Sequence, residues 1–177
     1  MPTLRAPQED GTANSMTDLL PWPHTLHQLL AVTIGGDPAG QGSIRTFKNG
    51  GMTYPKNTVN HRNRVIERLE QEWAGKPPIT GPIAVRAVFT FRRPDTHYRP
   101  PTKTGRPYRA ELKDDAPLWH TTKLRGDLDK CQRLLGDALE ISRVIDHDSL
   151  IVRWVVEKPY GPTGITHFEL YRPNGAP

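Results

Sequence analysis

The sequence contains little that would build a covalent scaffold or a large apolar core. Its single cysteine, Cys131, excludes an intrachain disulfide framework and a cysteine-rich zinc site. Hydrophobic residues make up 35% and aromatic residues 7% of the 177 residues, whereas globular chains are usually about 45–50% apolar. No apolar run approaches the roughly 18 residues of a membrane span, and the polar beginning lacks a signal peptide's apolar stretch. We therefore expect a cytoplasmic single-domain protein without a membrane partner.

Positive charge, glycine and proline are what the sequence has in excess. Lys and Arg number 24 against 19 Asp and Glu, which leaves a net charge of +5 and a pI near 9.5. Such a charge favours polyanionic partners. The 15 glycines and 18 prolines indicate long loops on a folded body.

Hydrophobic periodicity divides the chain into an arm and one domain. Residues 1–27 are polar and aperiodic, so we expect a disordered or loosely attached arm before a domain at 28–173. Alternating or short apolar runs predict strands at 29–34, 83–91, 150–156 and 165–171, with a hairpin near 44–51. Amphipathic patterns predict helices after Pro55, capped by Asn57 or Asn60, and over 128–139.

This order of elements predicts an α+β fold with a mixed β-sheet and two main helices packed on one face. Because the run at 150–156 is apolar on nearly both faces, we expect its strand to be central.

A long segment, residues 92–125, has five prolines, no convincing periodicity and a strong charge. Its nine basic and four acidic residues account for the whole net charge of the protein. Loops of this length are usually functional or mobile. Phosphate contacts are favoured over a merely solvated loop, because aromatic residues alternate with the cations.

The densest acidic constellation begins at Asp127 and Asp129. On a regular helix the two carboxylates point about 200° apart, but they converge if Gly126 lets the chain turn and Asp127 is the N-cap. Asp148, at the start of the strand that returns beside this helix, would complete an oxygen-ligand set for Mg²⁺. Arg133, four residues after Asp129, lies on the same helical face and could hold a scissile phosphate.

A structural interpretation stands beside this one. Asp127 is then a simple N-cap, Asp129, Arg133 and Asp137 form an exposed charge ladder, and residues 146–148 form a solvated turn. Two other motifs are weaker. The Gly-rich stretch 40–43 could cradle a phosphate but has no Walker lysine, and Cys131 lies on the apolar stripe, where a buried filler is expected.

Several stretches, taken together, resemble the RusA family of Holliday junction resolvases, particularly its phage-encoded actinobacterial branch. The resemblance covers residues 29–158. It rests on Pro38–Arg45, Ala116–Lys123, Asp127–Arg133, Asp137-Ala138-Leu139 and Asp146-His147-Asp148-Ser149.

The resemblance implies a homodimeric, Mg²⁺-dependent endodeoxyribonuclease, with Mn²⁺ as a substitute and no small-molecule cofactor. Its partner would be branched DNA, and it would resolve four-way junctions in DNA recombination and repair within a bacterial host cell, with phage or prophage origin left open. Asp127, Asp129 and Asp148 match the metal-binding catalytic aspartates, Arg133 matches the catalytic basic residue, and Asp137 matches a structural position. Independently of the resemblance, the positive charge of the segment 92–125 and of the helix that follows it predicts DNA contacts from Arg92, Arg93, Arg99, Lys103, Arg106, Arg109, Lys123, Arg125 and Lys130.

Three positions depart from the family pattern. Gly126 stands where proline is usual, Cys131 replaces a leucine, and His147 replaces the first acid of the final pair, where Asp146 is a fallback ligand. Gly126 and His147 leave open a catalytically inactive branched-DNA-binding protein of the same fold. A second alternative is an unrelated basic adaptor whose acidic helix is only a charge ladder.

Overall fold

The computed structural model describes residues 26–41, 45–46, 52–53, 55–99, 111–122 and 126–173. Residues 1–25 of the predicted arm lie outside this part of the chain, and His27 already begins the first strand. The elements are β1 (His27–Gly35), β2 (Arg45–Thr46), β3 (Met52–Thr53), α1 (Lys56–Trp73), β4 (Ile83–Arg92), η1 (Asp95–His97), α2 (Leu128–Ile141), η2 (Asp148–Leu150), β5 (Ile151–Glu157), β6 (Tyr160–Gly161) and β7 (Ile165–Arg172).

The main sheet has the strand order β1-β7-β4-β5, with β6 paired to the end of β4. Strand β4 runs parallel to β5 and β6 and antiparallel to β7, which also pairs antiparallel with β1. The prediction of an α+β fold with a mixed sheet is therefore confirmed. The predicted hairpin is present as the two-residue strands β2 and β3.

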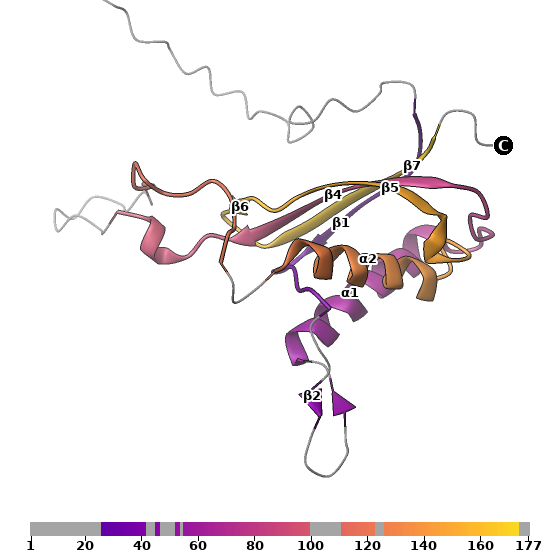
Figure 1. The fold of residues 1–177 in the computed structure, drawn as a ribbon, viewed down its shortest axis with the longest axis horizontal. Helices are drawn as coiled ribbons and strands as arrows, with labels where there is room; N and C mark the ends of the chain where they lie inside the picture. The colour runs from indigo at the N-terminus through magenta and orange to yellow at the C-terminus, as the bar shows by residue number, and fades with distance from the viewer. Residues whose placement is uncertain are drawn as a thin grey trace, which may run out of the picture.

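Both long helices lie on the same face of this sheet, as predicted (Figure 1). Apolar residues at helical spacing form the buried stripe of each helix, with Val65 and Leu69 on α1 and Leu135 and Leu139 on α2. These side chains pack with Phe168 of β7 in one hydrophobic core. None of the helices in the described ranges is long and apolar enough to cross a lipid bilayer.

The prediction that the strand at 150–156 is central is wrong. Strand β5 lies at one end of the strand order, and Val152 is 63% exposed. Its apolar residues instead pack from one face against the core, as Trp154 and Val156 do. Strands β7 and β4 hold the interior positions, and even Arg86 of β4 is buried, 3.6 Å from Glu169.

The first helix also begins differently from the prediction. Helix α1 starts at Lys56 with Pro55 in the N-cap position, and no side chain caps it, so neither Asn57 nor Asn60 has the predicted role. Proline fits there because its fixed φ suits the chain at a helix start.

The basic segment is partly folded, since its two flanks pair with each other. The Arg99 amide donates to the Glu111 carbonyl, and the Lys113 amide donates to the His97 carbonyl. Farther along, Trp119 forms a β-bridge with Pro159, beside β6. The described flanks, 92–99 and 111–122, are therefore attached to the end of the sheet nearest the start of α2.

Candidate functional site

The start of α2 carries the first predicted aspartates. Gly126 has a φ of +75°, and Asp127 follows as the N-cap residue, which confirms the predicted turn. The Asp127 side chain makes no capping hydrogen bond, although N-cap carboxylates ordinarily do. It pairs instead with the Lys130 ammonium at 2.5 Å. Asp129 lies exposed in the first turn.

Two lysines shape the electrostatics of this helix start. The hydrogen bond and the charge of Lys130 lower the pKa of Asp127, and the charge of Lys158 adds to the effect, while desolvation opposes it. The same pair raises the pKa of Lys130. The carboxylate of Asp127 is therefore held in its charged form, which is the form that binds cations.

A cleft of about 740 Å³ opens beside Asp127. It lies where the starts of α1 and α2 meet the ends of β4 and β6, and its volume falls within the range of ligand-binding clefts. Its lining includes two acids, two cations and aromatic rings: Asp37, Asp127, Lys130, Arg92, Phe91, His120 and Tyr160.

One wall of the cleft is formed by residues 37–40, which lead into the Gly-rich stretch 40–43. The Asp37 carboxylate accepts from the Arg92 amide at 3.2 Å, the Gly40 carbonyl accepts from the Thr58 hydroxyl at 3.1 Å, and the Gln41 amide donates to the Lys130 carbonyl at 2.9 Å. Residues 37–41 therefore connect the end of β4 with the starts of both helices. Gly42 and Ser43 lie outside the described residues.

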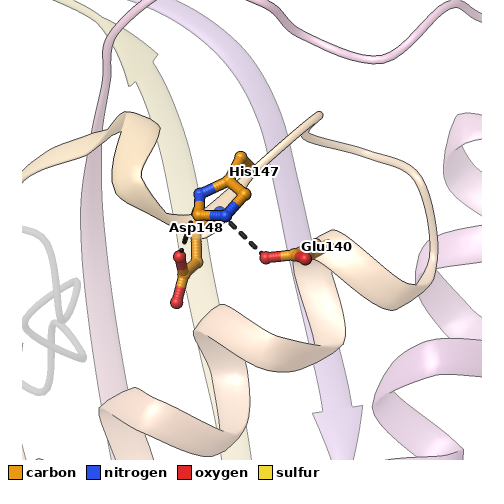
Figure 2. Close-up of side chains that lie close together, drawn as sticks. All are labelled: Glu140, His147 and Asp148. Atoms are coloured by element: carbon orange, nitrogen blue, oxygen red, sulfur yellow. Dashed lines mark hydrogen bonds and ion pairs between the residues drawn. The ribbon is translucent and has the colours of Figure 1, made fainter.

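Asp148 lies in a second cluster, shown in Figure 2 with Glu140 and His147. The Asp148 amide donates to the Glu140 carboxylate at 3.0 Å, and its own carboxylate lies 3.2 Å from the His147 ring. One ligand atom from each residue lies within 4.8 Å of the others, so this mixed set has donors that suit a divalent cation.

The two acidic sets lie at opposite ends of α2. Glu140, which contacts Asp148, follows Asp129 by eleven residues, or about 17 Å along a helix axis. The cause is strand direction: β5 begins beside the carboxyl end of α2 and runs back toward its amino end (Figure 1). Within one chain, Asp148 therefore does not join Asp127 and Asp129 around one cation, contrary to the expectation.

The predicted phosphate-binding residues fall into different environments. Arg92 is exposed at the cleft, whereas Arg93 is buried, donates to the Pro117 carbonyl at 2.7 Å and lies over the Tyr160 ring. Because Arg93 is used inside the chain, it is not available to phosphates. Arg99 pairs with Asp114 at 2.6 Å. The other predicted cations of this segment lie outside the described residues: Lys103, Arg106, Arg109, Lys123 and Arg125.

The structure does not support the alternative in which Asp129, Arg133 and Asp137 form a charge ladder. Arg133 is exposed and does not line the cleft, and no ion pair joins it to Asp129 or Asp137 within the described part of the chain. Cys131 is the predicted buried filler, and burial raises the pKa of its thiol to about 12.

Sequence reasoning missed Lys158. Its ammonium donates to the Gly126 carbonyl at 2.9 Å, directly before Asp127. A single lysine after a strand belongs to no local motif, and a separation of 32 positions in the sequence gives no local signal of the contact.

The α+β fold, with two acids and two cations around one cleft and the flanks of a basic segment attached beside it, is the arrangement expected of a protein that acts on nucleic-acid phosphates. A family model described as Endodeoxyribonuclease RusA matches residues 35–169, and the chain belongs to this family. Membership implies nuclease activity on DNA of the Holliday junction resolvase kind and does not favour the inactive alternative. No curated protein matches the chain.

Proposed function

We propose that this protein is a divalent-metal-dependent endonuclease that cuts four-way DNA junctions in recombination and repair. The observation that carries the proposal is the position of Asp127. Within the region matched by the family, it lies at an uncapped helix start, lines the cleft and has Asp129 two residues away.

The residues at this helix start fit a hard divalent cation. Asp127 presents an ionised carboxylate that already binds a cationic group, Lys130, instead of the helix amides. Carboxylate oxygens are the donors that Mg²⁺ and Mn²⁺ prefer. When bound, such an ion supplies an activated water and stabilises the oxyanions of phosphodiester displacement.

The chain's own cations hold the substrate. Arg92 and Lys130 line the cleft and place positive charge where a DNA strand would pass. Arg133 lies one helical turn after Asp129 and is exposed, so it can contact a DNA phosphate next to the one at the metal. The positive end of the α2 macrodipole adds to the attraction for anions at this end of the cleft.

The homodimer is part of the proposal, and the position of Asp148 supports it. If one cation is held by Asp127, Asp129 and a third aspartate, the separation within one chain requires Asp148 of the partner subunit. A two-fold dimer would then form two equivalent sites, one for each strand cut at a symmetric junction.

The metal centre is tested by cleavage of a synthetic four-way junction with and without Mg²⁺. D127N and D129N are expected to abolish cleavage while junction binding in EDTA persists, because each keeps the shape and removes one negative charge. D137N, two helical turns from Asp129, is the matched control and should cut normally. Normal cleavage by both D127N and D129N would place the metal centre elsewhere.

The dimer is tested by mixing two inactive chains. D129N and D148N are co-expressed with different tags, and the mixed dimer is purified. With ligands supplied across the dimer, one of its two sites keeps every aspartate, so the mixed dimer should nick one strand of the junction. If each chain supplies its own ligands, both sites are damaged and the mixed dimer stays inactive.

A further inference from the structure

Lys158 lies between β5 and β6, and its side chain contacts the start of α2, 32 positions earlier in the sequence. Its ammonium donates to the Gly126 carbonyl at 2.9 Å in a partly buried position. Lys158 thus contacts the residue that directly precedes Asp127 and sets its direction.

Phe91 contacts the Gly126 backbone as well. The φ of Gly126, +75°, is a conformation that residues with a side chain rarely adopt, and a Cβ added there would lie 2.2 Å from the Phe91 ring. The ring therefore packs directly against the Gly126 backbone while Lys158 holds the carbonyl. These two contacts determine the orientation of the peptide that leads into Asp127.

Four contacts link Lys158, His120, Phe91 and Gly126 in a closed ring. The His120 amide donates to the Lys158 carbonyl at 3.0 Å, and the His120 ring stacks on Phe91 with centroids 4.0 Å apart. Phe91 packs against Gly126, and Gly126 accepts from the Lys158 side chain. Lys158 takes part through both its backbone and its side chain. A substitution that removes the ammonium therefore breaks the contact that lies nearest Asp127.

We propose that Lys158 is a positioning residue for the metal centre, a role that rests on the proposed function. It holds Gly126 so that the Asp127 carboxylate faces the cleft, and it does not itself touch the metal or the scissile phosphate. Groups that orient metal ligands in this way are usually worth roughly 10- to 100-fold in metal affinity or activity.

The test uses the full-length chain and two separate readouts. Mn²⁺ binding is measured by calorimetry without DNA, and junction cleavage is measured under saturating junction. Lys158→Met should weaken Mn²⁺ binding and lower kcat by roughly 10- to 100-fold, with junction affinity in EDTA and the melting temperature near wild type. Lys158→Arg keeps the charge and the donors and should restore most of both losses.

The matched control is Lys76→Met. The Lys76 ammonium also donates to a backbone carbonyl, that of Glu72 at 3.2 Å, but at the other end of α1. Equal losses in K158M and K76M, or wild-type Mn²⁺ affinity in K158M, would overturn the proposal.

If K158M does not fold, Lys158→Gln replaces it with the same readouts, and wild-type Mn²⁺ affinity in K158Q overturns the proposal. A wild-type protein that neither binds Mn²⁺ nor cuts junctions would overturn the proposed function and this inference with it. Wild-type activity combined with an unaffected K158M would overturn the inference alone.

Discussion

The Lys130 ammonium occupies the Asp127 carboxylate that the proposed metal would need, at a distance of 2.5 Å. The pair lies three residues apart, across the first turn of α2, and it lines the cleft. Lys130 is therefore both a competitor for the metal and a cation available to DNA once a metal displaces it.

Lys130→Met should accordingly change two affinities in opposite directions. Mn²⁺ should bind more tightly, because no cation competes for Asp127, and the junction should bind more weakly with a salt slope reduced by about one unit. Calorimetry and binding titrations at several salt concentrations measure the two effects. Weaker binding of both ligands would show that Lys130 supports the helix start and does not compete there.

Gly126→Ala should destabilise the protein by about 2–5 kcal/mol, the sum of left-handed backbone strain and the overlap with Phe91. Gly75 separates these two costs, because its φ is +73° but nothing lies within 4 Å of an added Cβ. Gly75→Ala should cost only about 1–2 kcal/mol. Urea unfolding measures both, and equal losses would show that Phe91 moves aside without cost.

The neighbours Arg92 and Arg93 should respond differently to the same change. Arg92→Gln should weaken junction binding and flatten its salt dependence by about one unit without altering stability, because this guanidinium is exposed at the cleft. Arg93→Gln should lower the unfolding free energy by about 1–3 kcal/mol, because it removes the charged donor to Pro117. Melting curves and salt titrations separate the two, and a stable Arg93→Gln with weakened DNA binding would reverse the assignment.

His61 should make the stability depend on pH. It is buried against Thr166, and desolvation, with a smaller contribution from the Arg64 charge, lowers its pKa to about 4. As the pH falls, the histidine of the unfolded chain binds a proton before the buried ring does. The contribution of neutral His61 to the free energy of unfolding is therefore complete above pH 6.5 and declines as the pH falls toward 4.

Between pH 7 and pH 5 the loss from His61 is about 2 kcal/mol. Urea unfolding of His61→Gln should show a pH-dependent loss smaller by that amount. His27→Gln, which changes an exposed histidine of β1, is the control and should keep the wild-type loss. An unchanged pH dependence in His61→Gln would mean that the buried ring takes up a proton without cost.

Local patterns predicted those features of this protein that depend on neighbours in the chain. The spacing of Val65 and Leu69, or of Leu135 and Leu139, is enough to predict a helix with one buried face, because the helical repeat places such residues together. The turn at Gly126 and the N-cap position of Asp127 were predictable for the same reason, since both concern consecutive residues.

Only the tertiary structure decided which distant residues meet. The composition of β5 does not show that it lies at one end of the strand order, nor that its direction carries Asp148 to the far end of α2 and Lys158 to the near end. Likewise, Arg92 and Arg93 are adjacent cations in the sequence, and only packing against Tyr160 buries the second. Periodicity acts over a few residues, whereas strand order and direction follow from burying the whole apolar surface at once.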